Sequence, residues 1–168
     1  MDFHVEQLVT KKITAREYVL AAWILFATII IWWLSFSLLR QLATLSSIII
    51  LASGWGAFRL LQELSTEYEY ELTNEYLDID KIKGKARRKQ VVSIDLNKAE
   101  KCTYTESDEF KNKHGITKTY DLSGDISAYG KVFVDYHNEK GDKVRVIFRP
   151  NSKLAEAMKK SAPKVVRL

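Results

Sequence analysis

Two long apolar stretches lie near the start of the chain. The first runs without a charged side chain for 22 residues, from Tyr18 to Leu39, and the second for 18 residues, from Gln41 to Phe58. As helices they extend for about 33 Å and about 27 Å, close to the ~30 Å hydrocarbon core of a bilayer. The first stretch also lacks the polar face of a helix on a soluble protein. We therefore predict a transmembrane helical hairpin over residues 18–62.

The charges that flank the two stretches predict their orientation. Arg40 is the one charged residue of the short link between them, whereas Lys11, Lys12 and Arg16 precede the first stretch and a basic region follows the second. Positively charged flanks favour the cytoplasmic side. We expect a multi-pass protein of the cell membrane with both termini in the cytoplasm and a cytoplasmic N-terminal segment over residues 1–17.

Small residues recur every fourth position in the second stretch, at Ala52 and Gly56 and at Ser53 and Ala57. Faces of this kind let helices approach closely. We predict that these four residues pack helices together, either within the hairpin or against another membrane subunit. Neither stretch contains Asp, Glu, Lys or His, which argues against an ion or proton path built from this chain alone.

From about residue 65 the hydrophobic pattern changes from long runs to alternation. Tyr68, Tyr70 and Leu72 fall on one face of an extended segment, which is the pattern of a half-buried β-strand. We predict about seven antiparallel strands, over residues 68–73, 76–82, 89–96, 99–105, 116–122, 131–137 and 143–149.

A helix is predicted after the last of these strands. Pro150 interrupts the alternation, and Asn151 or Ser152 can cap a helix with an apolar stripe that ends before Pro163. The stripe consists of Leu154, Ala155 and Met158. So short a helix needs a sheet against which to pack.

The order of elements is carried by two segments, YEYELTNEYLDIDKIKGKARRKQVVSIDL (68–96) and FRPNSKLAEAMKKSAPKV (148–165). This order resembles a pleckstrin-homology-like (PH-like) domain, and the whole chain resembles small bacterial membrane proteins with two N-terminal transmembrane helices and a cytoplasmic PH-like domain. The resemblance implies an α+β membrane protein, with the helical hairpin followed by an antiparallel β PH-like domain and C-terminal helix over residues 65–168. That family has no assigned activity, so the resemblance implies an architecture and no catalytic residues.

Residues that could carry catalysis or bind a metal are few. His4, His114 and His137 have no regular spacing, and Cys102, the single cysteine, falls in a predicted strand. A metal site needs several converging ligands, and a catalytic thiolate needs a basic, exposed setting. We therefore predict no enzyme activity, no metal site and no cofactor.

Two carboxylates also come close together in the sequence. Asp78 and Asp80 share one face of a predicted strand. This favours a solvated sheet face, with pairing to Lys or Arg across strands, over an acid–base pair.

Positive charge is concentrated in one segment. The net charge is +5, and six cations within nine residues surround Gly84 without an acid between them: Lys81, Lys83, Lys85, Arg87, Arg88 and Lys89. They form either a solvated hairpin tip, a contact with anionic lipid head groups at about 1 kcal/mol per cation, or a contact with an acidic partner. No aromatic side chains interleave with them, so we expect no nucleic-acid partner.

These features together predict a non-enzymatic, membrane-anchored PH-like binding or scaffold module. It would recruit a protein partner or contact anionic lipid at the inner membrane surface. The alternative is an accessory subunit of a larger membrane complex, such as a transporter or envelope machinery, assembled through its transmembrane helices. An enzyme acting on lipid or peptide is disfavoured because no nucleophile–base or metal constellation is evident.

Overall fold

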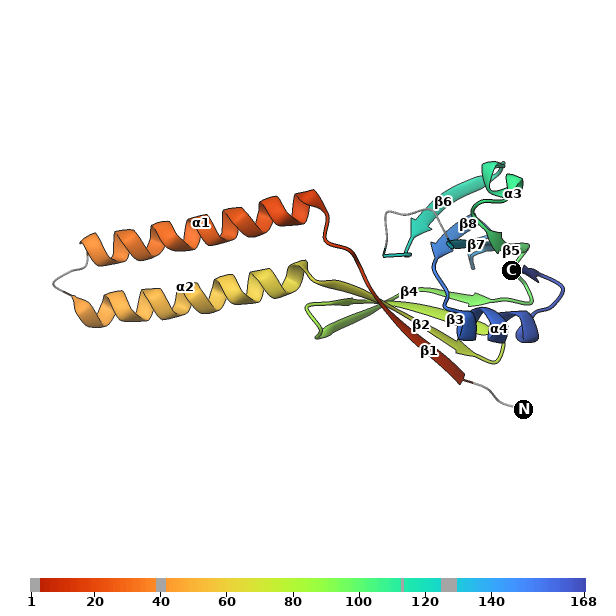
Figure 1. Ribbon diagram of the computed structural model, residues 1–168, viewed down its shortest axis with the longest axis horizontal. Coiled ribbons are helices and arrows are strands. Elements are labelled where there is room, and N and C mark those ends of the chain that lie inside the picture. The colour runs from red at the N-terminus through yellow and green to blue at the C-terminus, as the bar shows by residue number, and fades with distance from the viewer. Residues whose placement is uncertain (1–3, 39–41, 113, 125–129) are drawn as a thin grey trace. The chain divides into compact units, whose positions relative to one another are not determined.

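The computed structural model describes residues 4–38, 42–112, 114–124 and 130–168 (Figure 1). Its elements, in chain order, are β1 (His4–Thr10), α1 (Ala15–Leu38), α2 (Ala43–Leu64), β2 (Thr66–Thr73), β3 (Tyr76–Lys83), β4 (Arg87–Asp95), β5 (Lys101–Tyr104), α3 (Asp108–Lys111), β6 (Ile116–Asp121), β7 (Val132–His137), β8 (Lys143–Phe148), α4 (Ser152–Ser161) and β9 (Val166–Arg167). They form two compact units. The helical unit comprises Ile13–Thr66 and Lys83–Arg87, and the β unit comprises Met1–Lys12, Glu67–Ile82 and Arg88–Leu168.

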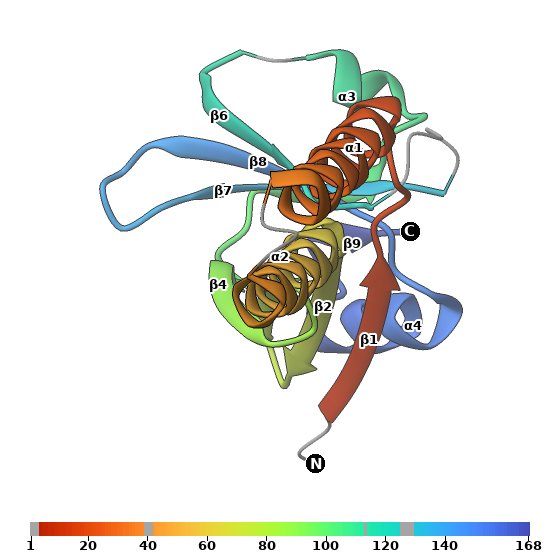
Figure 2. The same cartoon turned by 90° about the vertical axis from the view of Figure 1, so that its left-hand side faces the viewer.

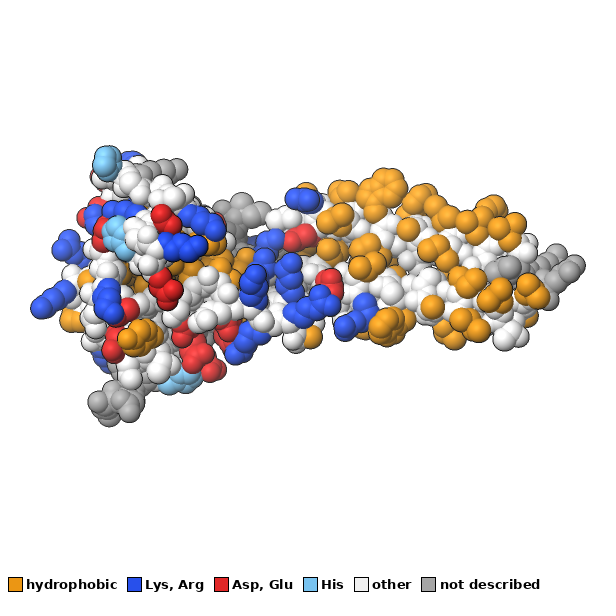
Figure 3. All heavy atoms as spheres, turned by 180° about the vertical axis from the view of Figure 1, so that it is seen from behind, with side chains coloured by type: hydrophobic (Ala, Val, Ile, Leu, Met, Phe, Trp, Pro, Cys, Tyr) orange, Lys and Arg blue, Asp and Glu red, His pale blue; other side chains and the backbone are white. Residues whose placement is uncertain are grey.

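Both long helices are long and apolar enough to cross a bilayer. The mean hydropathy of an 18-residue window reaches 2.2 in α1 and 1.4 in α2. Their large hydrophobic side chains are mostly exposed, with Trp33 at 68% and Leu51 at 74%, and Figure 3 shows such side chains along the surface of the helices. An apolar surface of this extent is unfavourable in water. The two predicted apolar helices are therefore confirmed, while the link at Arg40 lies outside the described residues.

α1 begins earlier than the first apolar stretch, and α2 ends later than the second. Local contacts account for both differences. α1 begins after Thr14, whose backbone N–H and hydroxyl both donate to the Glu17 carboxylate, at 2.7 and 3.1 Å. The Glu17 carboxylate thus caps the N-terminus of the helix, which begins before the apolar stretch does. α2 continues beyond Phe58 to Leu64 because Arg59 stays on the helix surface, with its guanidinium 5.9 Å from the centre of the Trp55 ring.

The β unit contains two sheets, one with strand order β1-β2-β3-β4 and one with order β6-β8-β7-β5-β9. All seven predicted strands are present, as β2 to β8. The sheets are mainly antiparallel, as predicted, with two exceptions: β6 pairs parallel with β8, and β5 pairs parallel with β9. The chain passes from β6 to β7 and then turns back into β8, which pairs antiparallel with β7. β8 lies between β6 and β7 in the sheet and runs in the same direction as β6. β9 is a further strand that the sequence analysis did not predict.

The segment before the first helix also forms a strand that was not predicted. β1 pairs antiparallel with β2, and Val5 lies opposite Leu72 in the core. The Gln7 amide donates to the carbonyl of Arg149 at 3.0 Å and accepts from the backbone N–H of Asn151 at 2.7 Å. β1 is therefore part of the β unit rather than of a separate N-terminal segment. In Figure 2, α4 lies beside β1.

One hydrophobic core joins both sheets and α4. The predicted helix is confirmed, and the Asn151 side chain caps it by accepting from the backbone N–H of Leu154 at 2.8 Å. Its buried face carries Leu154, Ala157 and Met158, with Ala157 in place of the expected Ala155. The largest fully buried side chains of the core are Tyr70, Phe133, Phe148, Leu72, Leu77, Ile79, Ile94, Leu96, Leu154 and Met158.

Two polar features are buried with the core. The Tyr70 hydroxyl donates to the carbonyl of Leu122 at 2.7 Å, and burial raises the pKa of this hydroxyl well above its ordinary value. On the facing strands β7 and β8, Asp135 and Arg145 lie directly opposite each other and form a bidentate ion pair, with both contacts at 2.7 Å. Both of these buried polar features are thus paired, which offsets the cost of burying them.

Candidate functional site

The predicted basic segment forms the tight turn between β3 and β4. The backbone N–H of Ala86 donates to the carbonyl of Lys83 at 3.2 Å, and both central residues, Gly84 and Lys85, have a φ of 58°. Two consecutive positive φ values are typical of the type I′ turn, which suits the twist of a two-residue hairpin. A lysine is uncommon in this backbone conformation. The turn thus holds Lys83 and Lys85, both exposed, at its tip.

Two contacts within the helical unit fix this turn to the end of α2. The backbone N–H of Gly84 donates to the carbonyl of Ser65 at 3.0 Å, and the Arg87 guanidinium lies 3.3 Å from the Glu63 carboxylate. Glycine suits position 84 because its φ of 58° is strained for other residues, and a Cβ there would lie 3.4 Å from the carbonyl oxygen of Gln62. The basic turn, which we define as residues 83–87, is therefore fixed beside the last turn of an apolar helix.

The remaining predicted cations have other surroundings. Arg88 forms ion pairs with Glu69 and Asp80, the latter at 3.6 Å. The Lys81 ammonium lies 6.0 Å from the centre of the Tyr68 ring. Lys89 is exposed on β4. The six cations are therefore not equivalent, and the arrangement gathers Lys83, Lys85 and Arg87 at the end of α2.

Cross-strand contacts also account for the two neighbouring aspartates. Asp80 pairs with Arg88, and Asp78 accepts a hydrogen bond of 3.2 Å from the Gln90 amide. Both acids lie on β3 and both partners on β4. The predicted cross-strand pairing to Lys or Arg is thus confirmed for Asp80, whereas the partner of Asp78 is a glutamine.

The predicted small residues of α2 divide into two pairs. The Ser53 hydroxyl accepts a hydrogen bond of 3.0 Å from the Trp32 indole of α1, and Ala57 is buried. Ala52 is exposed, and a side chain on Gly56 would meet nothing within 4 Å. Gly54, which was not predicted, does face Trp32, because a Cβ at this position would lie 3.4 Å from the indole ring. Ser53 and Gly54 thus lie against α1, whereas Ala52 and Gly56 do not.

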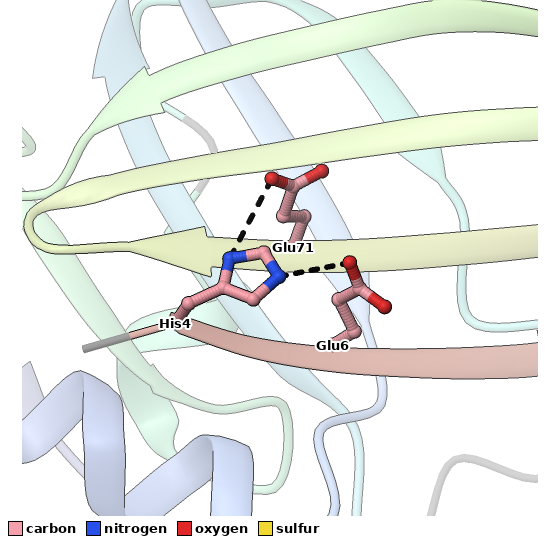
Figure 4. A group of neighbouring side chains, drawn as sticks. All are labelled: His4, Glu6 and Glu71. Carbon is pink, nitrogen blue, oxygen red and sulfur yellow. Dashed lines mark hydrogen bonds and ion pairs between the residues drawn. The ribbon is translucent and has the colours of Figure 1, made fainter.

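His4 contacts two carboxylates at the protein surface, whereas His114 is exposed in a turn. The two ring nitrogens of His4 contact the Glu6 carboxylate at 2.8 Å and that of Glu71 at 3.7 Å (Figure 4). These three side chains are the group of the described residues that could place three ligand atoms around a cation. The sequence did not reveal this cluster because Glu71 comes from the paired strand β2. Both nitrogens of His4 are already engaged by side chains, since Nδ1 also lies 3.0 Å from the Thr73 hydroxyl.

His137 and Cys102 have perturbed pKa values. The Gly141 carbonyl at 3.1 Å and the Glu100 carboxylate at 2.7 Å raise the pKa of His137 above its ordinary value. Burial alone raises the pKa of the Cys102 thiol to about 12. At neutral pH this thiol is protonated and buried, which is the setting of a structural cysteine rather than of a nucleophile.

A comparison with known proteins gives one match. The family model described as Bacterial PH-like domain (DUF6106) matches residues 1–168, the whole chain. No curated protein and no solved structure matches the sequence. The resemblance inferred from the sequence is confirmed, as is the order of two apolar helices, β sheets and a C-terminal helix. The matched description names a fold and no activity.

Proposed function

Because the chain belongs to the bacterial PH-like domain family, we propose that it is a non-enzymatic, membrane-anchored module whose basic turn contacts anionic lipid head groups at the inner membrane surface. The helices α1 and α2 anchor it as a transmembrane hairpin, and the flanking segments lie in the cytoplasm. The contact of the basic turn with the end of α2 carries this proposal.

The pairing of β1 with β2 supports a hairpin that crosses twice. β1 precedes α1 and β2 follows α2, yet the two strands share seven paired positions, from His4 opposite Thr73 to Thr10 opposite Glu67. Paired strands of one soluble sheet lie on one side of a bilayer. The chain between them must then cross the membrane an even number of times, which two spanning helices satisfy. The basic flanks of the hairpin favour the cytoplasmic side.

The position of the basic turn supports contact with head groups. A helix that crosses the bilayer ends at the interface, and Gly84 and Arg87 are held to the last turn of α2 through Ser65 and Glu63. We therefore expect Lys83 and Lys85 to lie within reach of the lipid phosphates. Anionic head groups attract a nearby cation by about 1 kcal/mol, within a Debye length of ~8 Å at physiological salt. With Arg87 partly neutralised by Glu63, we expect an attraction of about 2 kcal/mol from the two lysines.

Lysine footprinting of the full-length chain tests this proposal. The protein is reconstituted into liposomes of phosphatidylcholine alone or of equal parts phosphatidylcholine and phosphatidylglycerol. An amine-reactive reagent is added, and the modification of each lysine is measured by mass spectrometry. We expect Lys83 and Lys85 to be less reactive in the anionic liposomes, and the difference to disappear at high salt because an electrostatic contact is screened.

Lys140 serves as the matched control, because it is an exposed lysine of a hairpin loop, the one between β7 and β8. Its reactivity should not depend on lipid charge. A pattern in which Lys83, Lys85 and Lys140 respond alike to the lipid composition would contradict the proposal. In a second arm, Lys83→Gln with Lys85→Asn removes both charges, and asparagine tolerates the positive φ of residue 85. This variant should lose the preference for phosphatidylglycerol among co-purified lipids, whereas Lys140→Gln should keep it.

A further inference from the structure

A groove of about 790 Å³ lies in the β unit between β4 and the five-stranded sheet. Val91 and Ser93 line it from β4. The opposite wall is formed by Tyr120 of β6, Tyr136 of β7 and Val144 of β8. The groove is thus bordered along one side by a β-strand, and its volume falls in the range of binding sites for organic ligands.

The strand that borders the groove is the free edge of its sheet. β4 is the last strand in the order β1-β2-β3-β4, and among the described residues no strand pairs with its other side. The opposite edge, β1, differs because the Gln7 side chain binds the backbone of Arg149 and Asn151 there. An exposed edge presents backbone N–H and C=O groups that can pair with an added extended segment.

The walls of the groove favour apolar side chains. Val91, Tyr120 and Tyr136 pack against the core but are only partly buried, so each keeps a hydrophobic surface toward solvent. Lys98, Lys118 and Lys140 line the groove against Asp95, Glu139 and Asp142, and His137 adds one positive charge only when it is protonated, so the lining carries little net charge. Lys98 is also paired with Asp95 at 2.9 Å. The lining therefore selects neither an acidic nor a basic ligand, and specificity must come from hydrophobic contacts.

We propose that this groove binds an extended segment of a partner membrane protein. The segment adds to β4 as a fifth strand and directs a hydrophobic side chain at every second position toward Tyr120 and Tyr136. A membrane partner is favoured because β4 begins at Arg87, which is held at the end of α2. A partner segment that leaves the bilayer nearby meets the edge at high effective concentration. The inference rests on the proposed membrane anchoring but not on lipid binding by the basic turn.

A peptide selection with the full-length chain tests the proposal. The protein is embedded in phosphatidylcholine nanodiscs, and a library of random twelve-residue peptides is selected against it, with empty nanodiscs for counter-selection. We expect the enriched peptides to share hydrophobic residues at alternate positions. Methylation of single backbone nitrogens in the best peptide should weaken binding about tenfold at every second position and have little effect between them, because only alternate N–H groups of an added strand face β4.

Two matched substitutions locate the binding edge. Val91→Glu places a charge in the groove, and Leu8→Glu places the same charge on β1, where Leu8 is 57% exposed at the other edge of the same sheet. The first should weaken peptide binding about tenfold or more, and the second should leave it unchanged. The methylation series uses the unaltered protein, so it remains decisive if Val91→Glu destabilises the fold.

Several results would overturn the inference. These are the absence of enriched peptides, a methylation pattern without a period of two, and equal binding by the Val91→Glu and Leu8→Glu variants. Disulfide crosslinking of Ser93→Cys between two chains in one nanodisc would show that a second copy occupies β4 instead. None of these results bears on the lysine footprint, so loss of the peptide site and loss of lipid contact are distinguishable.

Discussion

Removing the buried arginine of the β unit should destabilise it severely. The side chains of Arg145 and Asp135 are only 3% and 7% exposed. Besides its two contacts with Asp135, the guanidinium donates to the carbonyls of Phe110 and Asn112, at 2.7 and 2.9 Å. It also lies 4.4 Å from the centre of the Phe133 ring. Arg145 thus connects the β7–β8 hairpin to the segment that contains α3.

The size of the expected loss of stability follows from the polar groups that Arg145→Met leaves without a partner. Methionine fills much of the volume, but the Asp135 carboxylate stays buried without its partner, and two carbonyls lose their donor. Breaking a buried pair by removing one member costs about 3–5 kcal/mol. Small domains have only about 5–15 kcal/mol of stability, so the free energy of unfolding of the β unit should fall by about a fifth or more.

Hydrogen exchange of the full-length chain in nanodiscs measures this effect. The backbone amides of β7 and β8 report the β unit, whereas all four tryptophans lie in α1 and α2 and report the helices instead. We expect the free energy of exchange of the β7 and β8 amides to fall by about 3–5 kcal/mol in Arg145→Met. Replacing both members, with Arg145→Met and Asp135→Leu, should recover most of the loss because no charge is left unpaired. A loss below about 1 kcal/mol in the single variant, typical of exposed pairs, would refute this reasoning.

Two further predictions concern single hydrogen bonds. Tyr70→Phe leaves the buried carbonyl of Leu122 without its donor. It should lower the free energy of unfolding of the β unit by about 1–3 kcal/mol, measured by the same exchange experiment. An unchanged value would contradict this prediction and would mean that water replaces the hydroxyl. NMR titration of the full-length chain should give His137 a pKa above 6.5. The protonated ring is favoured in the folded state, so its contribution to stability is present below pH 6.5 and is lost as pH rises through the folded pKa. Glu100→Gln should lower this pKa without abolishing the shift, because a backbone carbonyl is its larger cause, and a pKa unaffected by the substitution would exclude the ion pair as a cause.

Local patterns in the sequence predict the elements whose partners are close in the chain. The period of two from Tyr68 onward predicts β2, and the loop after His137 predicts the β7–β8 hairpin. The uncharged stretches predict α1 and α2 because lipid-facing helices need no polar face. β1 was missed although Val5, Gln7 and Val9 alternate with more exposed residues. Its partner β2 follows both helices, and such a distant pairing leaves no local signal.

The sequence predicts which cations cluster around Gly84, but not which of them lie together in the structure. The sequence gives six cations around Gly84, yet Arg88 pairs with Glu69 on β2 and only the structure separates it from the basic turn. The contact of Gly84 with Ser65 joins residues nineteen positions apart. The Asp135–Arg145 pair could have been found, because the five-residue loop of the hairpin sets a register that places the two opposite each other.

The central claim is that α1 and α2 cross the membrane as a hairpin with the β unit in the cytoplasm, and cysteine labelling tests it most directly. The native Cys102 is buried and its pKa is about 12, so it should give little background at neutral pH. Leu42→Cys places a thiol before α2, and Lys153→Cys places one on α4, both at exposed positions.

In intact bacterial spheroplasts, a membrane-impermeant maleimide should label Leu42→Cys at once. Lys153→Cys should be labelled only after lysis. Labelling of Lys153→Cys before lysis, or protection of Leu42→Cys until lysis, would contradict the account.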